Sequence, residues 1–292
     1  MTKSDIANYA DDTTPYAVDR TIDALMYALE DDTNILIKWF EDNYLKLNTY
    51  KCHLLVSKHN ECVFINAADD IIECENSVKL LGVTIDNKLT FHKHISTICK
   101  KANQKLHALA RISNLMNKDK LRILMKAFIE SQFGYCPLIW MFHNRTLNNK
   151  INRLHERALR LVYNDSQLTF QGLLRKDNSF SIHHRNLQKL AIEMYKVINN
   201  LSPSFMKNIF PIRDISYNLR HKNPFQSKNV NTVYNGTETL SFRGPKTWEM
   251  VPEIIKQSAS LSEFKAKIKH WEPKNCMCRL CKTYVAKIGF ID

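Results

Sequence analysis

The chain has little glycine and little proline, and it contains no long apolar run. Of its 292 residues, 6 are Gly and 8 are Pro. Because these two residue types punctuate turns, their scarcity favours a mostly helical protein. No stretch approaches the roughly 18 apolar residues of a membrane-spanning helix, and the N-terminus lacks the basic and then apolar pattern of a secretory signal. We therefore expect neither a membrane protein nor a secreted one.

The cysteines do not form an evenly spaced framework of the kind that small secreted domains carry. Five of the 8 cysteines are scattered between residues 52 and 136, as buried thiols in a reducing compartment would be. We therefore predict an intracellular protein of the nucleus or cytoplasm. Hydrophobic residues make up 44% of the chain, which excludes compositional disorder, and the length allows one large domain or two to three small ones.

Positive charge is in excess. The chain has 42 Lys and Arg against 29 Asp and Glu, a net charge of +13. Such an excess favours polyanionic partners, because counterions released from a phosphate backbone contribute affinity without base contacts. The alternative is that the excess positive charge serves only to keep the protein soluble.

Two adjacent carboxylates occur in Tyr9-Ala10-Asp11-Asp12, and Thr13-Thr14 come directly after them. Paired Asp side chains at a tight β-turn can hold Mg²⁺, and the metal can then stabilise the attacking and leaving oxygens of a phosphoryl transfer. Two neighbouring aspartates alone are common in solvated loops. The hypothesis therefore depends on the residues that come later in the chain.

Further blocks come after this turn in order. One runs from Trp39 to Asn48 with Lys51 behind it, and another runs from Val78 to Asp86 and continues through Leu89, Phe91 and His94-Ile95. In this order and at this spacing, the turn and the blocks resemble the reverse transcriptases of non-LTR (LINE-type) retrotransposons. The segments Tyr135–Trp140, Arg157–Arg160 and Phe242–Trp248 with Pro252 resemble later parts of the same proteins, so the resemblance extends over essentially the whole chain.

The resemblance implies RNA-directed DNA polymerase activity, with Mg²⁺ held by Asp11 and Asp12 and with Lys51 near the incoming nucleotide. The sequence also differs from this family in one respect. A complete enzyme of this family carries a fingers region and a first catalytic Asp before the turn, and eight residues cannot hold them. We therefore expect a truncated fragment that lacks polymerase activity by itself, in which Lys51 is an ordinary exposed lysine.

The pattern along the chain predicts an α+β, mostly helical fold. We expect a partial palm with a small antiparallel sheet in residues 1–92, a helical thumb-like bundle in 93–175 and a C-terminal helical region in 176–292. Residues 23–47 are predicted to be helical, with a second helix capped by Asp31 to Asn34. Residues 211–244 are predicted to form a loop or weak hairpin, and Ser260-Leu261-Ser262-Glu263 is predicted to start a last helix as a capping box.

Basic residues flank the apolar stripes of the predicted bundle. In the resembling family this region is the thumb, which grips the primer-template duplex, so we expect RNA, DNA or their hybrid to bind here. The candidate nucleic-acid-binding residues are Lys100, Lys101, Lys105, Arg153, Arg157 and Arg160. The apolar stripes themselves are expected to form core.

A cysteine cluster lies near the C-terminus. Cys276, Cys278 and Cys281 have spacings at which thiolates can share one Zn²⁺ ion, and His270 could complete the tetrahedron. Nearby basic residues would suit a small nucleic-acid-binding knuckle. The alternative is a set of exposed or half-buried thiols. The histidines at 183 and 184 are interpreted as ordinary surface or helix-end residues.

Three functions stay open at this point. The first is a truncated reverse transcriptase fragment that binds nucleic acid without sequence preference. The second is an RNA-directed DNA polymerase whose missing N-terminal part comes from a longer natural chain or from a partner. The third is an interaction module built around a zinc knuckle.

Overall fold

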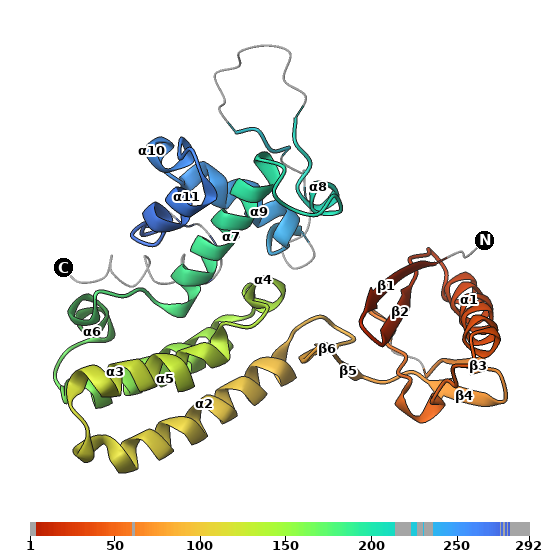
Figure 1. Ribbon diagram of the computed structural model, residues 1–292, viewed down its shortest axis with the longest axis horizontal. Coiled ribbons are helices and arrows are strands. Elements are labelled where there is room, and N and C mark those ends of the chain that lie inside the picture. Colours follow the sequence, from red (N-terminus) through yellow and green to blue (C-terminus); the bar gives the residue numbers. More distant parts are fainter. Residues whose placement is uncertain are drawn as a thin grey trace. The chain divides into compact units, whose positions relative to one another are not determined.

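The computed structural model describes residues 4–59, 62–213, 223–226, 230, 236–274, 276, 278 and 280. The chain divides into two compact units, residues 1–93 and 94–292 (Figure 1). The predicted boundary between residues 92 and 93 lies beside this division. The predicted boundary between residues 175 and 176 falls inside helix α6 (Phe170–Asp177). In the part of the chain that is described, no helix has the length and apolar character to cross a membrane.

The first unit combines one long helix with three short hairpins. The helix is α1 (Ile22–Asp42), and a 3₁₀ turn, η1 (Thr49–Lys51), comes after it. The antiparallel pairs are β1 (Asp5–Tyr9) with β2 (Asp12–Tyr16), β3 (Phe64–Ala67) with β4 (Asp70–Glu73), and β5 (Ser77–Leu80) with β6 (Val83–Asp86). We expected one small sheet, but each pair forms its own, because tight two-residue turns keep the pairing between neighbouring short strands.

The core of the first unit lies between α1 and the β3–β4 hairpin. Its buried members are Leu29, Ile37, Leu54, Val56, Ile65, Ala67 and Ile72. The predicted helix break at residues 31–34 is wrong, because α1 continues through it. Asn34 does not cap a helix; its side chain accepts a hydrogen bond from the Ala68 amide at 3.1 Å and so docks α1 on the hairpin.

The second unit begins with the helices that were predicted as a bundle. They are α2 (His92–Ile112), which starts at the unit boundary, α3 (Lys118–Phe128) and α5 (Arg145–Tyr163). Most residues of their predicted apolar stripes are buried, among them Ile95, Ala102, Met125, Ile151 and Ala158, whereas Phe128 at the end of α3 is exposed. The short helices η2 (Ser113–Leu115), η3 (Glu130–Phe133) and α4 (Pro137–Trp140) connect them.

A second group of helices encloses a separate core. It consists of α7 (Ile182–Ile198), α8 (Met206–Ile209), α9 (Leu240–Met250), α10 (Glu253–Lys256) and α11 (Leu261–Ile268). The capping box is confirmed, since Ser260 Oγ accepts from the Glu263 amide at 3.2 Å at the start of α11. Helix α9 begins inside the range predicted as a loop. Its Gly244 allows close packing, because a Cβ there would lie 2.3 Å from Phe210 Cε1.

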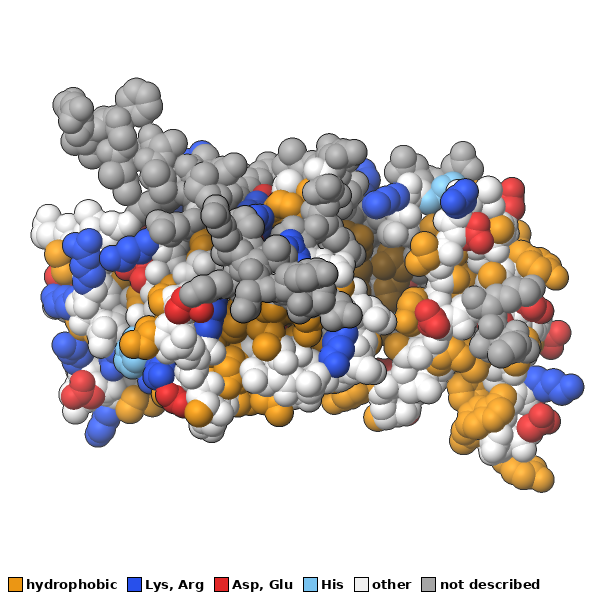
Figure 2. All heavy atoms as spheres, turned by 90° about the horizontal axis from the view of Figure 1, so that it is seen from above, with side chains coloured by type: hydrophobic (Ala, Val, Ile, Leu, Met, Phe, Trp, Pro, Cys, Tyr) orange, Lys and Arg blue, Asp and Glu red, His pale blue; other side chains and the backbone are white. Residues whose placement is uncertain are grey.

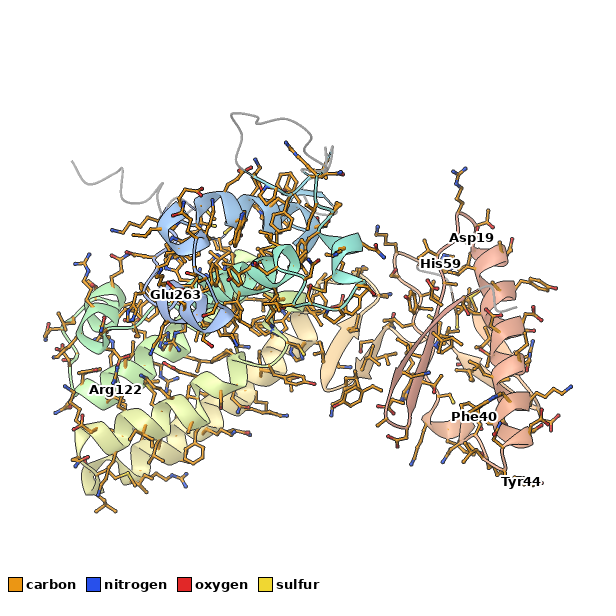
Figure 3. All side chains as sticks on the ribbon, turned by 45° about the horizontal axis from the view of Figure 1, so that its top comes forward. Asp19, Phe40, Tyr44, His59, Arg122 and Glu263 are labelled. Carbon is orange, nitrogen blue, oxygen red and sulfur yellow. The ribbon has the colours of Figure 1, made fainter. Side chains whose placement is uncertain are left out.

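Buried carboxylates tie the helices of the second unit together. Arg122, labelled on α3 in Figure 3, donates from Nε to Asp177 Oδ1 at 2.6 Å, and Tyr163 Oη donates to the same oxygen at 2.8 Å. Burial raises the pKa of Asp177, but the hydrogen bonds from Arg122 and Tyr163 outweigh it and hold the pKa below its usual range. The end of α6 is thereby fixed to α3 and α5.

Candidate functional site

Asp11 and Asp12 lie at the tip of the β1–β2 hairpin. The register pairs Tyr9 with Asp12, so Ala10 and Asp11 form a two-residue turn. Ala10 adopts a φ of 53°, a left-handed conformation that costs an L-residue roughly 1–2 kcal/mol but gives the positive φ that a tight hairpin turn requires. Both aspartates are exposed, so their carboxylates are open to a ligand from solvent.

This pair of carboxylates fits a hard divalent cation in part. Mg²⁺ takes an octahedral set of oxygen ligands and keeps several waters, so two carboxylates with water and phosphate oxygens can complete it. Asp11 and Asp12 would supply the protein's share. Lys51 lies at the end of η1, where it is exposed, and its role near a nucleotide stays a prediction.

Ser4, directly before β1, attaches the β1–β2 hairpin to α1. The backbone N–H and the hydroxyl of Ser4 both donate to the Asp32 carboxylate, which is buried on α1. Since a buried carboxylate has to be satisfied by donors, this contact holds β1 against the helix. The start of the strand that leads to the turn is thereby positioned.

The block from Trp39 to Asn48 builds the C-terminal end of α1. Asn43 Nδ2 donates to the Trp39 carbonyl at 2.8 Å, and the Leu45 amide donates to the Phe40 carbonyl at 2.8 Å. Between them Tyr44 has a φ of 58°, the left-handed conformation that ends many helices. The Tyr44 side chain is 98% exposed and projects from this end of α1 (Figure 3).

The block from Val78 to Asp86 forms the β5–β6 hairpin and its exit. Leu81 and Gly82 have φ values of 45° and 85°, the two positive angles of a type I′ turn. The Asp86 carboxylate then accepts backbone N–H groups from Thr90 at 3.0 Å and from Phe91 at 2.7 Å. The resemblance in this block therefore falls on residues that direct the backbone toward α2.

The predicted basic residues of the bundle separate into two sides of α2. Arg157 Nη1 donates to Asn103 Oδ1 at 3.1 Å, so α5 lies beside the Asn103 side of α2. At about 100° per residue, Lys100 lies about 60° from Asn103 around the helix, whereas Lys101 and Lys105 lie about 160° from it. Only Lys100 shares the α5 side. On the face that Figure 2 shows, Lys and Arg side chains are interspersed with hydrophobic and acidic ones.

The arginines of α5 also differ from one another. Arg153 and Arg157 are exposed and lie one helical turn apart. Arg160 is half-buried and donates to Glu156 Oε1 at 2.7 Å and to the Leu168 carbonyl at 2.9 Å. Its guanidinium therefore stabilises the connection from α5 to α6. Of the predicted residues on α5 and on the α5 side of α2, Lys100, Arg153 and Arg157 are exposed.

A groove beside α4, lined by three lysines and by Glu193, which pairs with Lys196, was not predicted from the sequence. The groove has a volume of about 530 Å³, and it is lined by Gly134, residues 136–139 and side chains of α7 and α11. Lys189 Nζ donates to the Gly134 carbonyl at 3.1 Å, and Lys196 and Lys265 line the same groove. Lys189 and Lys196 are seven residues apart, a spacing that places them on one face of a helix. The spacing of these two lysines is the sequence feature from which this face of α7 could have been predicted.

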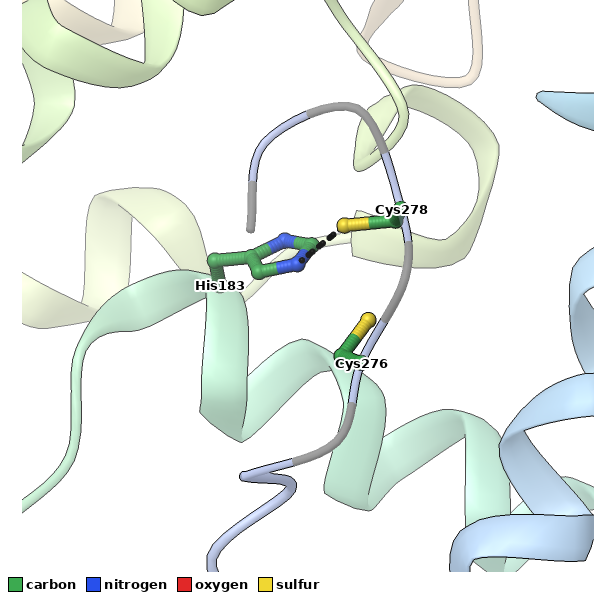
Figure 4. Close-up of side chains that lie close together, drawn as sticks. All are labelled: His183, Cys276 and Cys278. Atoms are coloured by element: carbon green, nitrogen blue, oxygen red, sulfur yellow. Dashed lines mark hydrogen bonds between the residues drawn. The ribbon is translucent and has the colours of Figure 1, made fainter. Parts of the chain in front are cut away.

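The C-terminal thiols lie beside a histidine that was interpreted as an ordinary surface residue. Nε2 of His183, on the first turn of α7, is 3.2 Å from Sγ of Cys278, and one ligand atom each of His183, Cys276 and Cys278 lies within 4.8 Å of the others (Figure 4). All three residues are buried, so the interpretation of His183 as a surface residue is wrong. His270 is exposed at the end of α11, and Cys281 lies outside the described residues.

Two further imidazoles surround this cluster. Burial, together with the neighbouring charge of His183, lowers the pKa of His143 to about 4. Burial and His183 likewise lower the pKa of His184 to about 4. Both rings are therefore neutral near pH 7, and neutral imidazole is the form that binds metal ions.

No protein-family model matches the chain, and no solved structure does. The chain is similar to the "RNA-directed DNA polymerase from mobile element jockey" of Drosophila melanogaster, with 21% identity over 238 residues, which cover 77% of this chain and 26% of that protein. It is also similar to the "probable RNA-directed DNA polymerase from transposon BS" of the same species, with 24% identity over 55% of this chain and 18% of that protein. A jockey polymerase of Drosophila funebris matches at 25% identity over 54% of this chain and 18% of that protein.

Proposed function

We propose that this chain, a relative of the RNA-directed DNA polymerases of non-LTR retrotransposons, is the part of such an enzyme that runs from the catalytic turn through the helices that hold the duplex. The chain spans about a quarter of the first relative's length and under a fifth of the other two. The activity of the whole enzyme is therefore proposed here only for a longer protein or an assembly.

The observation that carries the proposal is the turn itself. Asp11 and Asp12 occupy the tip of a two-residue hairpin, and both are exposed. A metal bound there would supply Lewis-acid stabilisation of the oxygens in phosphoryl transfer. The chain's own contribution is to place the two carboxylates beside each other, on a strand that Ser4 and Asp32 fix to α1.

We propose that the 292 residues do not extend a primer by themselves. Positioning and metal clamping supply most of the catalysis in phosphoryl transfer, and the turn that carries Asp11 and Asp12 belongs to a two-stranded sheet with exposed carboxylates. Within the first unit, two exposed carboxylates on such a turn supply little of that positioning. The second function, an active polymerase, requires the remaining segments from a longer chain or from a partner.

What the 292 residues do alone, in this proposal, is bind RNA, DNA or their hybrid through its phosphates. Lys100, Arg153 and Arg157 present positive charge along the neighbouring α2 and α5. Contacts between such side chains and phosphates carry no base information, so binding is expected to be independent of sequence and to weaken steeply with salt.

The test is the salt dependence of binding to an RNA–DNA hybrid, compared between two variants that each lose two positive charges. Lys100→Ala/Arg153→Ala removes charge from the α5 side of α2, and Lys101→Ala/Lys105→Ala removes it from the opposite side. Each phosphate contact contributes roughly 0.9 to the slope of log K against log salt. The first variant should lower the slope by about 2, and the second should leave it unchanged. Equal effects of both variants would reject this binding face.

A further inference from the structure

We propose that His183, Cys276 and Cys278 bind one Zn²⁺ ion that fastens the C-terminal segment to the first turn of α7. The three ligand atoms lie within 4.8 Å of one another, and His183 Nε2 and Cys278 Sγ are 3.2 Å apart (Figure 4). Imidazole nitrogen and thiolate sulfur are the ligands that Zn²⁺ prefers at structural sites. The proposal does not depend on the polymerase relationship.

The spacing of the three atoms suits a tetrahedral centre. With Zn–S near 2.3 Å and Zn–N near 2.0–2.1 Å, tetrahedral geometry requires about 3.6 Å between nitrogen and sulfur and about 3.8 Å between the sulfurs. In the structure, His183 Nε2 and Cys278 Sγ are 3.2 Å apart, slightly closer than this geometry requires, and all three ligand atoms lie within 4.8 Å of one another, at most about 1 Å beyond it. Side-chain rotations are therefore sufficient to close the cluster on an ion.

Apart from the neighbouring imidazoles, the cluster lies against apolar side chains. Cys276 and Cys278 belong to a buried group with Met141, Leu187 and Leu280. An apolar shell excludes water and strengthens the attraction between a cation and thiolates.

The position of His183 on α7 also favours thiolate ligands. Helix α7 is 17 residues long and Ser181 is its N-cap, so His183 lies in the first turn. The positive end of a helix dipole stabilises thiolates, which are the form of cysteine that binds metals.

The ligands come from two segments that are 95 residues apart in the chain. A contiguous zinc knuckle would hold only its own short loop, as the sequence pattern of the C-terminal cysteines suggested. A centre that includes His183 instead joins the C-terminal segment to α7, and metal binding then stabilises the fold across this long separation.

The fourth position has two candidates among the described residues, His143 and His184, the imidazoles beside the cluster. His143 Nδ1 lies 2.9 Å from the Trp140 carbonyl oxygen. When Nδ1 donates to this carbonyl, the lone pair remains on Nε2, the tautomer found in many metal-binding histidines. His143 lies two residues after Met141, which belongs to the same buried group as both cysteines. The predicted ligand Cys281 lies outside the described residues.

The experiment measures zinc in the full chain purified without added metal or chelator, by elemental analysis and by the absorption spectrum after replacement with Co²⁺. We expect one zinc ion per chain and the strong visible bands of tetrahedral Co²⁺ with thiolate ligands. His183→Ala and Cys278→Ser should each lower zinc affinity at least tenfold. His270→Ala is the matched control, because His270 is exposed, and it should leave the affinity unchanged. His143→Ala and His184→Ala then identify the fourth ligand by which of them changes the Co²⁺ spectrum.

Other results would overturn the proposal. If zinc is absent and neither added Zn²⁺ nor Co²⁺ binds with micromolar affinity or better, the cluster is a buried thiol–imidazole contact without a metal. If zinc binds but is lost in His270→Ala and kept in His183→Ala, the metal belongs to a local C-terminal knuckle. Circular dichroism spectra that match the parent protein establish that His183→Ala and Cys278→Ser are folded. Should either variant fail to fold, Co²⁺ titration of the parent protein with and without thiol alkylation decides the same question.

Discussion

Gly244→Ala should destabilise the second unit, although alanine is the better helix former. Gly244 lies in α9, and a Cβ built there would come within 2.3 Å of Phe210 Cε1 and 2.9 Å of Met194 Sδ. Carbon atoms pack favourably at about 3.5–4.0 Å, so the overlap with Phe210 exceeds 1 Å. Phe210 is fully buried beside the Phe225 ring and has little room to move.

The magnitude results from two opposing effects. Adding a methyl group to a well-packed core costs about 1–3 kcal/mol, and an overlap of this size with a fixed ring belongs at the upper end. Replacing a helical glycine with alanine gains about 1 kcal/mol. The net loss is therefore about 2 kcal/mol. For a unit of this size it should lower the midpoint of thermal unfolding by roughly 4–8 °C, at about 2–4 °C for each kcal/mol.

The assay is urea unfolding followed by circular dichroism, with Gly172→Ala in α6 as the matched control. A Cβ at Gly172 would first meet Leu168 Cδ2 at 3.2 Å, the far end of a flexible side chain that can move aside. The control should change the free energy of unfolding by less than about 1 kcal/mol. Adding Phe210→Leu to Gly244→Ala should recover part of the loss, because the smaller side chain makes room. A Gly244→Ala variant as stable as the parent would refute the packing argument.

Three further perturbations test other parts of the fold. The pKa of Asp177 is held below its unfolded value. The stability from its pairing with Arg122 is therefore present above about pH 4 and is lost as the pH falls through the folded pKa. In urea unfolding, the free energy of unfolding of Asp177→Asn should differ less between pH 7 and pH 3 than that of the parent. Asp86→Ala should cost the first unit about 1–3 kcal/mol, because backbone N–H groups lose their acceptor, whereas Asp69→Ala at an exposed site should cost little in the same assay. Ala10→Gly should stabilise the first unit by up to about 1 kcal/mol in thermal unfolding, since glycine adopts positive φ without strain. No change at Asp86, or a loss at Ala10, would contradict the turn geometry.

The helices of the bundle were predictable because their periodicity is a local property of the sequence. Ile95, Ala102 and Leu109 recur at helical spacing and are buried on one side of α2. The capping box at Ser260 was equally local, and it starts α11 as expected. In contrast, the predicted break in α1 failed because Asp32 and Asn34, which resemble cap residues, bond instead to Ser4 and to Ala68.

The parts of the candidate sites that the sequence did not reveal depend on contacts between distant residues. The side of α2 that faces α5 is defined by Asn103 and Arg157, so Lys100 could not be distinguished from Lys101 by charge alone. His183 meets Cys278 only because α7 and the C-terminal segment pack together. Spacing rules for metal sites operate within a short segment and do not detect such a pair.

The most direct test of the proposed function is primer extension by the purified 292-residue chain on a primed RNA template with Mg²⁺ and deoxynucleotides, with binding to the same template measured in parallel. The Asp11→Ala/Asp12→Ala variant is the control for the catalytic turn. We predict that both proteins bind the template with the same affinity and that neither extends the primer. Extension by the parent chain that disappears in the double variant would contradict this prediction, because the chain alone would then assemble a working polymerase site.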